Sequence, residues 1–169
     1  RGFSHDDFAA RHPGGSLGMR LLKVEEKMRP VEHCRLARPE DTVRLVFARP
    51  LPSRRTGAVM IVSAENRLVG IFTDSDLAKL FGNRQDDALD RPIGEVMTRE
   101  PISVLEGTRL EDAVSLLDSC RVSELPVIDK SGCPSGLIDI VDLVGGDIAA
   151  SSRDSSSTET DQCRHSSAA

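Results

Sequence analysis

The fold is indicated first by an eight-residue segment that occurs in two diverged copies, the first of which is Gly70-Ile71-Phe72-Thr73-Asp74-Ser75-Asp76-Leu77. It returns 66 positions later as Gly136-Leu137-Ile138-Asp139-Ile140-Val141-Asp142-Leu143, with glycine, aspartate and leucine in register. A short β-rich run precedes each copy at the same spacing, Ala58-Val59-Met60-Ile61-Val62 and then Leu125-Pro126-Val127-Ile128. Self-similarity at a fixed spacing indicates a repeat architecture, so we infer two diverged copies of one unit of about 60 residues.

The two copies share one internal order of helices and strands. Apolar residues at i, i+3, i+4 and i+7 spacing predict a helix with one buried face ahead of the strands in each copy. These residues are Val43, Val46 and Phe47 in the first copy and Leu110, Ala113, Val114 and Leu117 in the second. The turn-forming stretches 63–66 and 129–132 separate two strands and favour hairpins. The unit is therefore β-α-β-β-α, and the fold class is α/β.

The second strand of the first copy leads directly into another helix. Thr73 is placed to cap it, and Gly82 is a stop signal. Leu77, Leu80 and Phe81 form its apolar face. One copy with two amphipathic helices on a small sheet has little core, whereas two copies packed face to face bury what one cannot.

The repeated unit resembles the CBS domain family over about Lys23 to Gly146. The resemblance rests on three kinds of segment: Met28-Arg29-Pro30 and Val96-Met97-Thr98, the strand Glu124-Leu125-Pro126-Val127-Ile128-Asp129, and the two Gly-x-x-x-x-x-Asp-Leu endings. It implies a tandem pair related by a pseudo-twofold axis, with ligand clefts between the sheets. We expect the first CBS domain at 25–86 and the second at 87–148.

The N-terminal stretch is similar to the end of the SIS sugar-isomerase domain of arabinose 5-phosphate isomerases. The similarity lies in Arg1-Gly2-Phe3-Ser4-His5-Asp6-Asp7-Phe8-Ala9 and His12-Pro13-Gly14-Gly15-Ser16-Leu17-Gly18. In that family the SIS domain directly precedes a CBS pair, and the enzymes interconvert D-arabinose 5-phosphate and D-ribulose 5-phosphate for Kdo and lipopolysaccharide synthesis. We therefore expect residues 1–24 to be an SIS remnant and the chain to be an inactive C-terminal fragment of such an isomerase.

His12 is the residue of this stretch that can do chemistry. Aldose–ketose isomerisation through an enediol needs a group that moves protons near neutral pH, which suits histidine. The family resemblance assigns a catalytic histidine to this position in the full-length parent. The alternative is that His12 only ends a helix before Pro13.

Thr73 and Asp76 are the strongest candidates for a ligand site. Their hydroxyl and carboxylate stand at a strand-to-helix junction, where a ribose and a phosphate can be held. The CBS family uses this pattern for nucleotides, although Thr-x-x-Asp is also a capping box that needs no ligand. In the second copy Asp142 is the corresponding candidate, but Asp139 replaces the hydroxyl. Two carboxylates one helical turn apart oppose a phosphate unless a cation or a basic residue intervenes, so we expect the two sites to be unequal, with the Thr73–Asp76 site the stronger. Asp139 is equally well explained as an N-cap.

Arg55 is a further candidate, because the loop before the first β-rich run faces the ligand in a CBS cleft and an arginine there can pair with a phosphate. The alternative is a solvated loop. The expected ligand is a nucleotide or sugar phosphate, with AMP, ATP and a CMP-sugar such as CMP-Kdo as the candidates, and no cofactor is required. The competing function is a ligand-free oligomerisation module, and in both cases we expect a homo-oligomer, a dimer of CBS pairs within a tetrameric parent.

Composition excludes several other classes. The net charge is −5, the basic residues are scattered and aromatics make up 3%, so a nucleic-acid surface is not expected. No apolar run is long enough to span a membrane, which favours a cytoplasmic protein. The cysteines lack C-x-x-C spacing, so no metal site is predicted. The Ser-rich segment 149–169 is expected to be a disordered tail.

Overall fold

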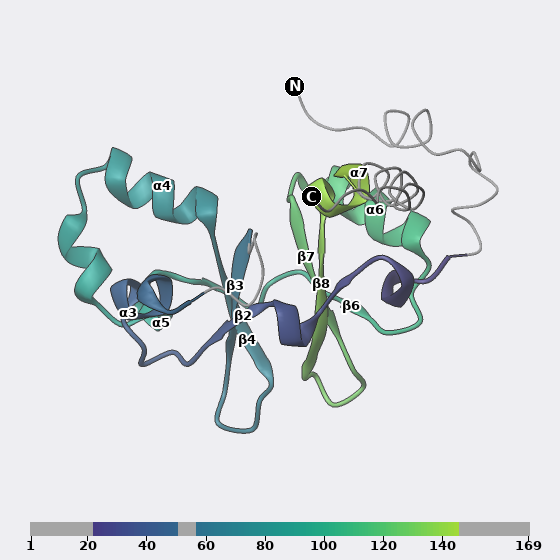
Figure 1. Cartoon of the computed structure of the whole chain (residues 1–169), viewed down its shortest axis with the longest axis horizontal. Coiled ribbons are helices and arrows are strands. Elements are labelled where there is room, and N and C mark those ends of the chain that lie inside the picture. Colours follow the sequence, from purple (N-terminus) through teal and green to yellow (C-terminus); the bar gives the residue numbers. More distant parts are fainter. Residues whose placement is uncertain (1–21, 51–56, 146–169) are drawn as a thin grey trace, which may run out of the picture.

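The structure is a computed structural model that describes residues 22–50 and 57–145. Two small β-sheets face each other, and the helices lie on their outer sides (Figure 1). Helices α3, α4 and α5 lie beside one sheet, and α6 and α7 lie beside the other (Figure 1). Residues 1–21 of the expected SIS remnant and the tail 149–169 lie outside the described residues.

Both units have the predicted order β-α-β-β-α. The first consists of β2 (Arg35–Ala37), α3 (Val43–Ala48), β3 (Ala58–Val62), β4 (Leu68–Thr73) and α4 (Asp74–Gly82). The second consists of β6 (Val104–Leu105), α6 (Leu110–Cys120), β7 (Glu124–Ile128), β8 (Pro134–Asp139) and α7 (Ile140–Gly145). The connecting elements are η1 (Val24–Glu26), β1 (Arg29–Pro30), η2 (Val31–His33), η3 (Asp86–Asp90), α5 (Ile93–Val96) and β5 (Thr98–Arg99).

Strand pairing is the same in both units. A helix connects the first two strands, so β2 runs parallel to β3 and β6 runs parallel to β7. A short hairpin connects the next two, so β4 and β8 run antiparallel to their neighbours. The prediction of an α/β CBS-type pair is therefore confirmed in its architecture.

Each sheet is completed by a strand from the segment that leads into the other unit. Strand β1 precedes the first unit but pairs antiparallel with β8 of the second. Strand β5 precedes the second unit but pairs antiparallel with β4 of the first. Ladder hydrogen bonds thus join each unit to the segment that precedes the other. The division into domains at 25–86 and 87–148 stays a prediction.

The repeated glycine is explained by this exchange. A Cβ atom at Gly136 would lie 2.5 Å from the carbonyl oxygen of Arg29 and 2.7 Å from Sδ of Met28. A Cβ atom at Gly70 would likewise collide with the side chain of Met97. Since Met28 and Met97 occupy equivalent places ahead of the two units, each methionine needs a glycine opposite it.

The core has one apolar layer beneath the helices of each unit and a third between the two sheets. Strand β3 is buried along its whole length. Val59 and Ile61 pack in the helix layer of the first unit, whereas Met60 packs with Ile71 and Leu137 between the sheets. Because Leu137 belongs to the second unit, neither sheet could bury its inner face alone.

Helix α4 ends at Gly82 as predicted. Leu77 and Leu80 pack against the core of the first unit, but Phe81 is 55% exposed. The apolar stripe of this helix is therefore wider than its buried surface. Within the described residues, no helix has the length and apolarity that crossing a membrane requires.

Candidate functional site

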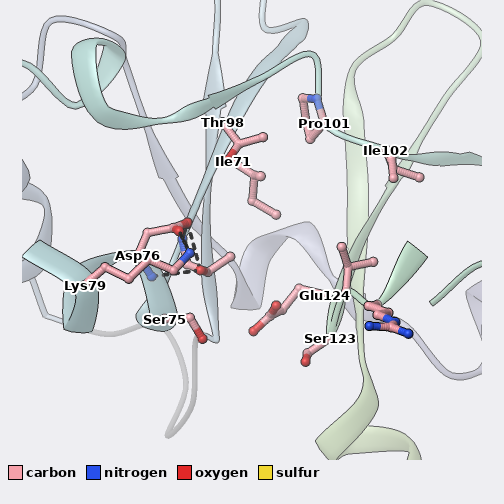
Figure 2. Close-up of a pocket in the computed structure, with 12 residues that line it drawn as sticks. Ile71, Ser75, Asp76, Lys79, Thr98, Pro101, Ile102, Ser123 and Glu124 are labelled. Atoms are coloured by element: carbon pink, nitrogen blue, oxygen red, sulfur yellow. Dashed lines mark hydrogen bonds and ion pairs between the residues drawn. The ribbon is translucent and has the colours of Figure 1, made fainter. Parts of the chain in front are cut away.

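A pocket of about 300 Å³ lies between the two units (Figure 2). The first unit contributes the end of β4 and the start of α4, and the second contributes the residues that begin β7. The lining residues are Ile71, Thr73, Ser75, Asp76, Lys79, Thr98, Pro101, Ile102, Arg121, Val122, Ser123 and Glu124. Apolar side chains and a few convergent polar groups are typical of a small-molecule site.

Thr73 and Asp76 form a complete capping box at the start of α4. The Thr73 hydroxyl oxygen accepts from the Asp76 amide at 3.1 Å, and the Asp76 carboxylate accepts from the Thr73 amide at 3.1 Å. The second oxygen of the carboxylate accepts from Nζ of Lys79 at 2.8 Å. Burial raises the pKa of Asp76, but these hydrogen bonds from Lys79 and Thr73 outweigh it and leave the pKa below the ordinary value. A carboxylate therefore faces the pocket at neutral pH.

Glu124 lines the opposite side of the pocket, and its carboxyl group points toward the side that holds Ser75 and Asp76 (Figure 2). Burial, followed by the charges of Asp139, Asp74 and Asp76, raises the pKa of Glu124 to about 7. The pocket thus pairs one fixed carboxylate with one that exchanges a proton near neutral pH.

Arg121 lines the pocket and has an unusual backbone conformation. It follows α6 with φ of 54°, in the left-handed region that normally favours glycine. The sequence interpretation did not include this residue. It follows Arg55 by 66 positions, so applying the repeat spacing to Arg55 would have found it.

The equivalent corner of the second unit contains three charged side chains. Oδ1 of Asp139 accepts from the amide of Val141 at 2.8 Å, so Asp139 caps α7. Nη2 of Arg29 lies 2.5 Å from Oδ2 of Asp142 and 3.5 Å from Oδ2 of Asp139. A basic residue from β1 therefore intervenes between the two carboxylates, which the sequence left open without identifying Arg29.

Two of the predicted site residues, His12 and Arg55, lie outside the described residues. The structure brings Thr73 and Asp76 together in the pocket, whereas Asp142 belongs to the second corner. Ser123 and Glu124 were missed as site residues, although Glu124 begins a strand of the repeat. Among the described histidines, cysteines and acidic residues, no three gather in a way that could hold a metal ion.

The fold and the cleft between the sheets define a tandem CBS pair. A family model described as "CBS domain" matches residues 93–146. CBSX2, solved in complex with AMP, is similar with a TM-score of 0.60 at 24% identity, over 76% of this chain and 98% of that chain. The CBS pair of MJ0100, solved with 5-methylthioadenosine and S-adenosyl-L-methionine, has a TM-score of 0.61 at 22% identity, over 72% of this chain and 96% of that chain.

In sequence the chain is homologous to arabinose 5-phosphate isomerases. KpsF of Escherichia coli is 37% identical over 143 residues, which are 84% of this chain and 42% of that protein. KdsD of Francisella tularensis is 32% identical over 145 residues, 85% of this chain and 43% of that protein. The chain spans less than half the length of these relatives, and the resemblance to their family seen in the sequence is confirmed.

Proposed function

We propose that the chain is the regulatory, C-terminal CBS pair of an isomerase that interconverts D-arabinose 5-phosphate and D-ribulose 5-phosphate. The pocket would bind a nucleotide or nucleotide sugar, and binding would modulate the attached enzyme. The observation that supports this most directly is the pocket between the units, which combines the Thr73–Asp76 corner with Ser123 and Glu124. The homology to KpsF and KdsD supports the parent activity.

The chemistry of the lining suits a nucleotide. Ile71, Ile102 and Val122 offer apolar contact for the faces of a base. The Asp76 carboxylate can accept hydrogen bonds from ribose hydroxyls, which are charge-assisted and stronger than neutral ones. Arg121 and Lys79 are the cations in the lining that can approach a phosphate. The solved complexes of CBSX2 and MJ0100 contain adenine-based ligands, in agreement with this class.

Titration calorimetry of this chain with AMP, ATP and CMP-Kdo tests the proposal. We expect saturable binding of at least one of them, and Thr73→Val, which removes the hydroxyl at nearly constant volume, should weaken it. Thr108→Val is the matched control, because the Thr108 hydroxyl is exposed and donates to the Leu105 carbonyl outside the pocket. Lack of binding by the unmodified chain at millimolar ligand would refute the sensing role.

The proposal also covers the parent enzyme, which would act in the cytoplasm on phosphorylated sugars. His12 would move protons there, and the chain alone would be inactive. In the full-length isomerase, His12→Ala should lower kcat strongly, whereas Asp76→Ala should change only the response to the regulatory ligand. Unchanged turnover by the His12 variant would refute its catalytic role.

A second candidate is an assembly module that needs no ligand. Apolar side chains on the outer helices favour it, because Phe81 of α4 is 55% exposed and Leu45 of α3 is 48% exposed. Such a module would hold protomers together as a dimer of CBS pairs within a tetrameric parent. Sedimentation at tens of micromolar, combined with the calorimetry, distinguishes the two functions. A dimer that binds no nucleotide favours assembly, whereas nucleotide binding, by a dimer or a monomer, favours sensing.

A further inference from the structure

The cleft has two corners related by the repeat, and they differ in one decisive position. The first corner contains Thr73 and Asp76, and the second contains Asp139 and Asp142, each 66 positions later. The segments ahead of the units repeat with a spacing of 69, so Thr98, which lines the first corner, corresponds to Arg29 in the second. A short hydroxyl side chain is thus replaced by a long cation.

The Arg29 side chain is enclosed within the second corner. It is 9% exposed and contacts Asp142 and Asp139, which are 33% and 5% exposed. The pairing of Arg29 with Leu137 in the ladder between β1 and β8 fixes the arginine backbone beside these carboxylates. The guanidinium therefore occupies Oδ2 of Asp142, the residue that corresponds to Asp76.

The cation of the first corner is held much less firmly than Arg29. Lys79, which pairs with Asp76, is 69% exposed and comes from the same helix three residues later. An exposed pair of this kind contributes little to stability and is readily exchanged for a ligand hydroxyl. Removing Arg29 from its partners would instead leave the buried Asp139 without this cation, which is costly in a low-dielectric environment.

We propose that Arg29 is an internal ligand that closes the second corner, so that each chain binds one nucleotide, in the first corner. The ligand class rests on the proposed function, whereas closure rests on the ion pairs of Arg29 alone. The second corner then has a structural role, because the same ion pairs hold the segment before the first unit against the second unit.

Calorimetric stoichiometry with AMP tests this on the unmodified chain and on three variants. Arg29→Thr gives the second corner a threonine, the residue that the first corner has at the equivalent position 98. Arg29→Thr/Asp139→Thr also removes the buried carboxylate that pairs with Arg29. Arg44→Thr is the control, because Arg44 forms an exposed ion pair with Asp90 and does not line the pocket. Thermal melting of each protein establishes that it is folded.

We expect one equivalent of AMP for the unmodified chain and for Arg44→Thr, and two for the double variant, with the first affinity unchanged within about twofold. Two equivalents in the unmodified chain would overturn closure and leave the proposed function standing, as would one equivalent in both the unmodified chain and a folded double variant. No binding by the unmodified chain, with one equivalent in the double variant, would refute the first corner and support closure. No binding by the unmodified chain or by the double variant would refute both the first corner and closure. If the double variant fails to fold, the stoichiometry of the unmodified chain is the deciding measurement.

Discussion

Thr73 and Asp76 satisfy each other's backbone amides at the start of α4, each donating to the other's side chain at 3.1 Å. This reciprocal pair is both a helix cap and one wall of the pocket. The cap uses one carboxylate oxygen of Asp76, Oδ2. Within α4, the other oxygen, Oδ1, accepts from the exposed Lys79 and is accessible to a ligand. The two interpretations of Thr-x-x-Asp are therefore compatible, and mutation can separate their energies.

Asp76→Ala should lower nucleotide affinity about ten- to hundredfold, because it removes charge-assisted hydrogen bonds of roughly 1.5–3 kcal/mol. The free energy of unfolding should fall by only about 0.5–1 kcal/mol through loss of the cap. Calorimetry and urea denaturation at one salt concentration measure both. Asp90→Ala, which breaks an exposed ion pair elsewhere, should leave affinity unchanged. An unaltered affinity in Asp76→Ala would contradict the ligand role.

Glu124 should make the folded state less stable as pH rises. Its pKa lies at about 7 in the folded chain against the ordinary 4.5. The folded state thus holds a proton that the unfolded state loses, so stability falls between about pH 4.5 and 7 and levels off above. Because the side chain is only part-buried, we expect a loss of about 1–2 kcal/mol.

Glu124→Gln should remove this decline and be more stable than the unmodified chain at pH 8. Urea denaturation at pH 5, 6, 7 and 8 checks it. Glu95→Gln is the control, because Glu95 is exposed and paired with Arg91. Parallel pH profiles for the unmodified chain and Glu124→Gln would show that this carboxyl group does not titrate in the range.

Arg121→Gly should stabilise the fold and weaken nucleotide binding. Glycine relieves the left-handed backbone, which costs an L-residue about 1 kcal/mol, and it removes a cation from the pocket lining. AMP affinity should fall about fivefold or more, whereas adenosine, without a phosphate, should bind as before. Arg84→Gly, at φ of 53° and outside the pocket lining, should stabilise without affecting AMP. Equal AMP affinity in both variants would exclude Arg121 from phosphate binding.

Gly136→Ala should destabilise the fold more than Gly70→Ala. The added methyl at position 136 meets a backbone carbonyl, which cannot move without disturbing the β1–β8 pairing. The methyl at position 70 meets only the flexible Met97 side chain. We expect about 2–3 kcal/mol for Gly136→Ala and about 1 kcal/mol for Gly70→Ala, by urea denaturation. Met97→Ala should rescue only Gly70→Ala, and equal losses would argue against the exchanged strands.

The repeated β-α-β-β-α unit and the helix start at Thr73 could both be predicted from the amino-acid sequence. Both depend on local chemistry, since the spacing of apolar residues and the capping hydroxyl act within a few residues of each other. The repeat also identified Asp76 as a candidate, because its position relative to the strand end is fixed by short-range geometry.

The groups that meet across the cleft, in contrast, could be identified only from the folded chain. Arg29 reaches Asp139 and Asp142 over more than one hundred positions, because β1 crosses to the sheet of the other unit. The pKa of Glu124 likewise depends first on burial and then on charges from other elements, Asp139, Asp74 and Asp76. Hydrophobic spacing specifies which face of an element is buried, but it does not specify which distant charge will lie against that face, because that depends on how the two units pack.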